Sequence, residues 1–197
     1  NVGTTTLAGV ELTGNDAGQA PGNGGGLHLT GAGTVEVLQS TVTDNTAVEG
    51  GGLWNSSGGT FTVRGTSLEG NSASGAEADQ GGGAIYSDGG TTEVLGSDLV
   101  DNSATGAAGS GGGILNKGGS LVVRRSVLDG NDAQRAGGGI ESSAGSTEVF
   151  RTDLLGNDAG AAPGNGGGLH LTGAGTVDVA QSTVSGNTAV EGGGLWN

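Results

Sequence analysis

The chain has 197 residues, with 20 acidic and 6 basic side chains, and its formal net charge is −14. This charge argues against nucleic acid and anionic lipid as partners, because both would be repelled. The absence of cysteine excludes disulfides and cysteine-ligated metal sites. A content of 48 glycines would indicate low complexity or disorder if the glycines were not periodic.

The glycines recur as triplets at intervals of 26 to 31 residues, which is typical of a repeat architecture. The triplets begin at Gly24, Gly50, Gly81, Gly111, Gly137, Gly166 and Gly192. An Asn-x-Ala motif follows the start of each of the first six triplets after 20 or 21 residues, and a further copy precedes the first triplet. The length varies between this motif and the next triplet, so each unit has a core of nearly constant length and one variable loop.

The core of a unit contains three short strands in chain order. In the second unit the apolar residues are Leu53, then Phe61 and Val63, then Leu68, with the alternation expected of half-buried strands. Glycine-rich corners such as "TGAG" and "SSGG" separate the first two strands, and no segment shows a sustained helical period. Three such strands can bury their apolar faces when the units stack on one another.

We therefore expect an all-β fold, a right-handed parallel β-helix with three short strands per coil and about seven coils of 26–31 residues. A left-handed helix would need shorter coils of about 18 residues. At about 4.8 Å per coil, the rod would be about 33 Å long. The triple glycine is then a structural corner, since no phosphate-binding GxxxxGK[ST] motif and no calcium-binding nonapeptide is present.

The string "GGGLHLTGAGTVEVLQSTVTDNTA", which starts at Gly24, resembles the repeats of right-handed parallel β-helix surface proteins. It is similar to the polymorphic outer-membrane protein repeats, which pair a GGA/GGG-[ILV] motif with an F-x-x-N motif. In this chain an aliphatic residue replaces the aromatic one, at Val42-x-x-Asn45, Leu68-x-x-Asn71, Leu99-x-x-Asn102 and Leu128-x-x-Asn131. The resemblance covers the whole chain and implies the β-helix fold, which by itself does not define a function.

A larger module is duplicated within the chain. Residues 14–55 and 156–197 align without gaps at an offset of 142 and are identical at 37 of 42 positions. The offset equals five coils, so a five-coil module was duplicated. The chain starts and stops in the middle of a coil without a polar cap. We therefore expect residues 1–197 to form a single continuous β-helix segment that is a window of a longer array.

One asparagine per coil, at the same corner, predicts a ladder of stacked side-chain amides. The expected members are Asn15, Asn45, Asn71, Asn102, Asn131, Asn157 and Asn187. We interpret this ladder as structural.

A second column lies two residues after each triplet and is expected to point outward. Its members are His28, Trp54, Ile85, Leu115, Glu141, His170 and Trp196. A contiguous exposed apolar patch usually marks an interface, and this stripe is apolar at its centre. Three interpretations are open: contact with an identical neighbour, cover by the variable loops, or stacking of carbohydrate on the two tryptophans.

No catalytic or cofactor site is expected. His28 and His170 are equivalent residues five coils, or about 24 Å, apart, too far to act together. A glycosidase needs two carboxylates at a set separation, whereas Asp98 and Asp153 are two coils, or about 10 Å, apart. Carboxylates on consecutive coils, chiefly Glu148 and Asp178, leave room for weak calcium binding.

We expect a non-enzymatic structural segment of a large extracellular or cell-surface repeat protein. It would form a rigid stalk, fibre or appendage for attachment and would associate with itself as a homo-oligomer or fibre. The alternative is an adhesin module whose loops, on one edge of the helix, bind surface glycans or proteins of another cell. No direct insertion of this segment into a membrane is expected.

Overall fold

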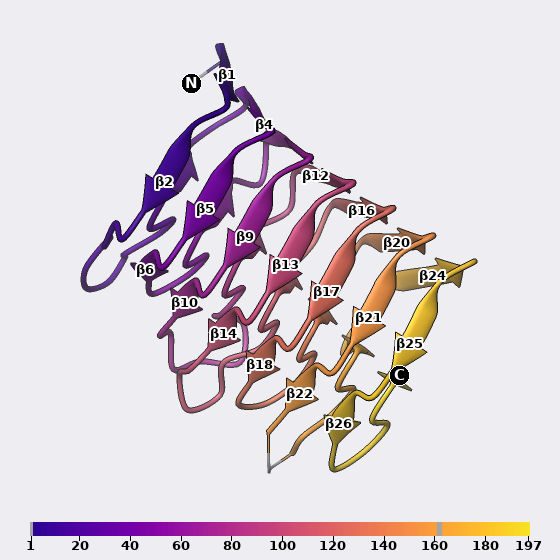
Figure 1. Ribbon diagram of the computed structural model, residues 1–197. Helices are drawn as coiled ribbons and strands as arrows, with labels where there is room; N and C mark the ends of the chain where they lie inside the picture. Colours follow the sequence, from indigo (N-terminus) through magenta and orange to yellow (C-terminus); the bar gives the residue numbers. More distant parts are fainter. Residues whose placement is uncertain (1, 161–162) are drawn as a thin grey trace.

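The computed structural model describes residues 2–160 and 163–197, so residue 1 and residues 161–162 of the predicted segment lie outside the described part. The chain winds into a parallel β-solenoid whose coils are stacked side by side from the N-terminal to the C-terminal end (Figure 1). Four sheets run along the stack, and six or seven strands make up each of them. The predicted all-β class and the number of about seven coils are confirmed.

Two sheets carry the middle of each coil. Sheet A contains β1 (Thr4–Ala8), β4 (Thr34–Leu38), β8 (Thr60–Arg64), β12 (Thr91–Leu95), β16 (Ser120–Arg124), β20 (Ser146–Phe150) and β24 (Thr176–Ala180). Sheet B contains β2 (Glu11–Thr13), β5 (Thr41–Thr43), β9 (Ser67–Glu69), β13 (Asp98–Val100), β17 (Val127–Asp129), β21 (Asp153–Leu155) and β25 (Thr183–Ser185). Each sheet A strand is followed by a sheet B strand after a two-residue corner.

The other two sheets flank the variable loop. Sheet C contains β6 (Thr46–Ala47), β10 (Ser72–Ala73), β14 (Ser103–Ala104), β18 (Asp132–Ala133), β22 (Asp158–Ala159) and β26 (Thr188–Ala189). Sheet D contains β3 (Leu27–Leu29), β7 (Leu53–Asn55), β11 (Ile85–Ser87), β15 (Ile114–Asn116), β19 (Ile140–Ser142), β23 (Leu169–Leu171) and β27 (Leu195–Trp196). Sheet C corrects the expected three strands per coil to four, because the Asn-x-Ala backbone itself pairs with the next coil, as in Ser72 N–H to Asn45 O at 2.9 Å.

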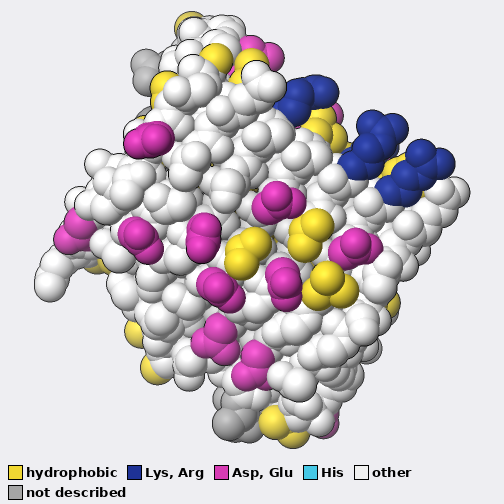
Figure 2. Space-filling model, viewed as in Figure 1, with side chains coloured by type: hydrophobic (Ala, Val, Ile, Leu, Met, Phe, Trp, Pro, Cys, Tyr) yellow, Lys and Arg dark blue, Asp and Glu magenta, His cyan; other side chains and the backbone are white. Residues whose placement is uncertain are grey.

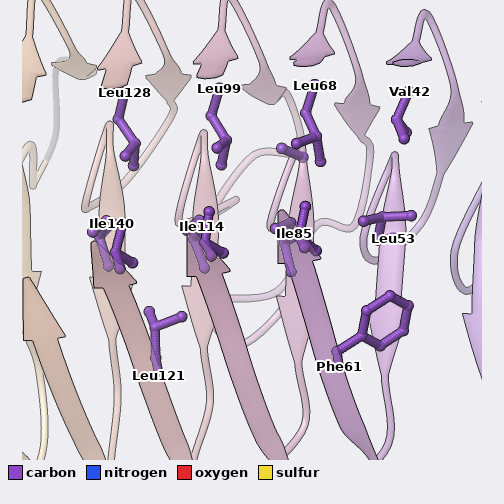
Figure 3. Close-up of a cluster of buried hydrophobic side chains, with 14 of the residues drawn as sticks. Val42, Leu53, Phe61, Leu68, Ile85, Leu99, Ile114, Leu121, Leu128 and Ile140 are labelled. Carbon is purple, nitrogen blue, oxygen red and sulfur yellow. The ribbon is translucent and has the colours of Figure 1, made fainter. Parts of the chain in front are cut away.

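The core is a set of apolar columns, each built from the same position of successive coils. Figure 3 shows one column from sheet B, with Leu68, Leu99 and Leu128, facing another from sheet D, with Ile85 and Ile114. These side chains are fully or almost fully buried. Parallel stacking without an offset therefore turns the sequence repeat directly into a continuous hydrophobic core.

The third coil differs by one residue from the expected register. Its triplet begins at Gly81, but the left-handed turn that Gly50 makes in the second coil is made here by Gly82, with φ of 63° and 66° respectively. Ile85 consequently pairs with Leu53 and points into the core. The assignment of Ile85 to the outward column was wrong, and Tyr86 takes that place. The register shifts by one residue because Gly81 belongs to the variable loop that precedes the corner.

Candidate functional site

The asparagines lie at one corner, between sheets B and C, and are joined by hydrogen bonds along the whole stack. The Asn71 Nδ2 group donates to Asn102 Oδ1 at 2.9 Å and to the carbonyl oxygen of Val42 at 2.8 Å. Asn102 Oδ1 also accepts the Asn71 backbone N–H at 3.0 Å. Each interior amide thus links three coils, and the amide-to-amide bonds from Asn15 through Asn187 measure 2.8–3.0 Å.

A second polar ladder, which the sequence reasoning missed, runs along the corner between sheets A and B. Its members are Ser40, Thr66, Ser97, Ser126, Thr152 and Ser182. The Thr66 backbone N–H donates to Ser97 Oγ at 3.2 Å, and Ser97 Oγ donates in turn to the carbonyl oxygen of Leu95. The signal was available, because a serine or threonine stands two residues before the inward leucine or valine of every sheet B strand in this set.

The outward stripe on sheet D is covered in the middle of the rod. Trp54, Tyr86 and Leu115 form an apolar cluster of their own, separate from the core, and are 9%, 0% and 0% exposed. Loop residues hold it: Tyr86 Oη donates to the carbonyl oxygen of Asp79 at 3.0 Å, and Trp54 Nε1 donates to Glu49 Oε2 at 3.2 Å. The expectation of a contiguous exposed apolar patch is therefore wrong for these coils, and the structure supports cover by the variable loops.

The aromatic residues of the stripe pack on one another. The Trp54 ring lies parallel to that of Tyr86, with a centroid separation of 6.0 Å and an interplanar angle of 6°, and the His28 ring meets Trp54 edge-on at 4.4 Å. Because Trp54 packs against rings on both neighbouring coils and is almost fully buried, little of its surface is left for stacking a sugar. Burial raises the pKa of Tyr86 and of the half-buried Glu49 carboxyl above their ordinary values.

Farther along the stripe, Glu141 and His170 form a buried polar cluster. His170 Nδ1 lies 2.8 Å from Glu141 Oε2, and both side chains are at most 1% exposed. The Thr172 hydroxyl donates to Glu141 Oε1, and Arg135 Nη1 lies 3.8 Å from the same oxygen. The carboxylate thus has three neighbours that stabilise its charge, and this arrangement can hold two coils together.

The two duplicated histidines have different surroundings. His28 is exposed, its Nε2 lies 3.1 Å from the Thr30 hydroxyl, and partial burial lowers its pKa. His170 is buried against Glu141 on the preceding coil. His28 lies on β3, the first strand of sheet D, so among the described residues only Trp54 of the following coil stacks on it in register, whereas His170 lies between Glu141 and Trp196.

Glu148 and Asp178 line a shallow groove of about 200 Å³ on sheet A, together with hydroxyl groups of Ser146 and Thr176. Arg124 already pairs with Glu148, through Nη2 at 2.8 Å and Nε at 3.1 Å. Across residues 2–160 and 163–197, no three His, Cys, Asp or Glu side chains gather closely enough to hold a metal ion. Weak calcium binding in this groove stays a prediction.

Comparison with known proteins adds the family. The family model described as "Right handed beta helix region" matches residues 1–189, whereas no curated protein and no solved structure matches the chain. No helix long and apolar enough to cross a membrane occurs in the part of the chain that the structure describes. Since the match spans almost the whole sequence and the coils stack as parallel strands, the chain belongs to the right-handed beta-helix family.

Proposed function

We propose that this segment is a rigid, non-catalytic spacer within a large extracellular or cell-surface repeat protein, where it forms part of a stalk, fibre or appendage for attachment and associates with copies of itself. The observation that carries the proposal is that hydrogen bonds join successive coils along the whole stack. The amide ladder and the hydroxyl ladder run beside four sets of parallel strand pairs, so every coil is tied to the next at several points. Such a stack resists bending and local opening, because a break costs many hydrogen bonds at once.

The placement of the candidate catalytic groups supports a non-catalytic role. Asp98 and Asp153 point outward from sheet B with Val127 between them in register. The Glu141–His170 pair is buried, so a substrate would have to displace the surrounding chain to reach it. The near-identical copies at residues 14–55 and 156–197 also favour a repeated mechanical element over a single active site.

Distance measurements on the chain test the spacer role. Because the sequence has no cysteine, Thr6→Cys with Asp178→Cys would give one unique pair of spin-label sites on the outer face of sheet A, six coils apart. A rigid rod predicts one narrow distance distribution centred near 29 Å, from about 4.8 Å per coil. The pair Thr6→Cys with Val122→Cys is the internal control and should centre near 19 Å. Broad or multiple distributions for both pairs would overturn the proposal.

A second candidate function is binding of glycans or proteins by the loop edge. It is favoured by a hollow of about 410 Å³ beside the first loop, whose lining includes Asp16, Gln19 and Ser74. A carbohydrate microarray probed with the chain, and with the variant Asp16→Ala and Gln19→Ala as control, tests it. Glycan binding that the variant loses would support the adhesin role, and a blank array at high protein concentration would contradict it for glycans.

A further inference from the structure

The surface charges of the rod are segregated. Figure 2 shows the acidic side chains spread over the face formed by sheets B and C, while basic side chains line one edge of that face. Four of the six basic residues of the chain lie at the corner between sheets A and B. We call this set, Arg64, Arg124, Arg125 and Arg151, the arginine corner. Arg64 and Arg125 form no ion pair with any residue that the structure describes.

Two of these arginines stand where the backbone favours glycine. Arg125 and Arg151 have φ of 53° and 51°. The equivalent corners of the other coils use glycine or glutamine, also with positive φ, at Gly9, Gln39, Gly65, Gly96 and Gln181. A left-handed conformation is less favourable for a residue with a Cβ atom than for glycine. The corner thus accepts long polar side chains, and the two arginines place a cation there on consecutive coils. Arg151 Nε donates to Gln181 Oε1 at 2.9 Å and its guanidinium lies 5.0 Å from the Phe150 ring centroid, so its charge is held at the surface without a carboxylate partner among the described residues.

The acidic face has an ordered pattern. On sheet B, Asp98, Asp129 and Asp153 alternate with the half-buried apolar residues Val100 and Val127. Directly stacked positions of β13, β17 and β21 therefore pair a carboxylate with an apolar side chain, which avoids like charges side by side. Further carboxylates extend this face, and we define the acidic face as Glu69, Asp98, Asp101, Asp129, Asp132, Asp153 and Asp158.

We propose that rods associate laterally, with the arginine corner of one copy seated on the acidic face of a second copy. This inference rests on the self-association included in the proposed function and assigns it to a surface other than the covered stripe. The charges of the two surfaces are opposite, and the apolar side chains between the carboxylates add contact area. The arginine corner and the acidic face are different surfaces, so a copy that contributes its corner to one neighbour can offer its face to another, and the contact can extend from rod to rod.

The coil repeat gives this contact its register. Arg125 and Asp129 belong to one coil, and Arg151 and Asp153 belong to the next. Two parallel rods with no axial shift therefore place an arginine opposite a carboxylate of the same coil, at steps of about 4.8 Å. A shift by a whole coil keeps part of the pairing, so the geometry favours staggered bundles as well.

Glycine variants test the proposal without disturbing the fold. Arg125→Gly with Arg151→Gly installs the residue that other coils already use at this corner. Sedimentation equilibrium of wild type should show concentration-dependent association that weakens with added salt, and the variant should associate about tenfold more weakly. The matched control is Gln39→Gly, which relieves the same kind of backbone strain at the same corner and leaves every charge, and Gln181 as the hydrogen-bond acceptor of Arg151, in place. Equal association of the two variants, or a monomeric wild type at low salt, would overturn the proposal.

A charge-swap mixture distinguishes this contact from any other self-association. The variant Arg125→Glu with Arg151→Glu and the variant Asp129→Lys with Asp153→Lys should each fail to self-associate, while their mixture associates. A mixture that stays dissociated, with both variants folded by circular dichroism, contradicts the assignment to these surfaces. The spin-label distances within one rod do not depend on contacts between rods. Loss of this lateral contact would therefore leave the spacer role intact. A flexible rod, in contrast, would be detected by its broad spin-label distance distributions.

Discussion

His170 Nδ1 lies 2.8 Å from Glu141 Oε2 on the neighbouring coil, and both side chains are buried. Removal of His170 leaves the buried Glu141 carboxyl short of a hydrogen-bond partner, so His170→Ala should lower the free energy of unfolding by about 1–3 kcal/mol. The duplicated His28 is the control, since it packs against Trp54 but has no carboxylate partner, and His28→Ala should cost less than His170→Ala. Urea denaturation of both variants measures this difference, and equal losses would show that the pair has no stabilising role.

Asn102 is an interior member of the amide ladder. Its side chain accepts two hydrogen bonds from Asn71 and donates to Leu68 O and Asn131 Oδ1. Asn102→Leu leaves several of these buried groups unpaired and should destabilise the rod by about 2–4 kcal/mol. Asn15→Leu, at an exposed end of the ladder, should cost clearly less because water can replace the lost bonds. Similar unfolding midpoints for Asn102→Leu and wild type would remove the ladder from the stability argument.

The hydroxyl ladder predicts that two substitutions of Ser97 have different effects on stability. Ser97→Ala removes the acceptor of the Thr66 N–H and should cost about 1–2 kcal/mol in the free energy of unfolding. Ser97→Thr keeps the hydroxyl, and threonine already occupies this position as Thr66 and Thr152, so its effect should be within about 0.5 kcal/mol. Chemical denaturation of both variants measures these changes in the free energy of unfolding. An alanine variant as stable as the threonine variant would mean that the hydroxyl contributes nothing.

Tyr86 anchors a variable loop through its hydroxyl, which donates to Asp79 O. Tyr86→Phe keeps the parallel stacking on Trp54 and loses this bond, so the loop of residues 74–80 should be cleaved faster by a protease. Thermal unfolding should change little, because the aromatic packing is retained. Peptide mapping after limited proteolysis locates the cut. Unchanged cleavage in the loop would show that other contacts hold it.

Glu49 predicts a pH dependence of stability. Burial raises the pKa of its carboxyl, so protons bind the folded state more tightly than the unfolded state. The stability that this group contributes is present below its unfolded pKa and is lost as the pH rises through the raised folded pKa. Glu49→Gln, which keeps a Trp54 acceptor without the charge, should therefore gain stability relative to wild type between about pH 4 and pH 7. Urea titrations at both pH values measure the gain, and a constant difference would contradict the shift.

The fold could be predicted from the sequence because parallel stacking repeats one environment. Leu68, Leu99 and Leu128 recur at the same position of each unit and form one core column. The same logic placed the seven asparagines at one corner. It failed in the third coil, where Gly81 belongs to the loop and Ala84 takes the place of the third glycine. The outward position there is therefore Tyr86 and not Ile85.

The sequence by itself determined the coil length, the inward columns and the position of the amide ladder, since all three repeat with the period of the chain. The tertiary structure alone decided which outward side chains meet solvent. The variable loops are not periodic, and their paths over Trp54, Tyr86 and Leu115 depend on contacts such as Tyr86 to Asp79. The partner of His170 was likewise decided by the tertiary structure, because the preceding coil, and not the residue's own segment, supplies Glu141.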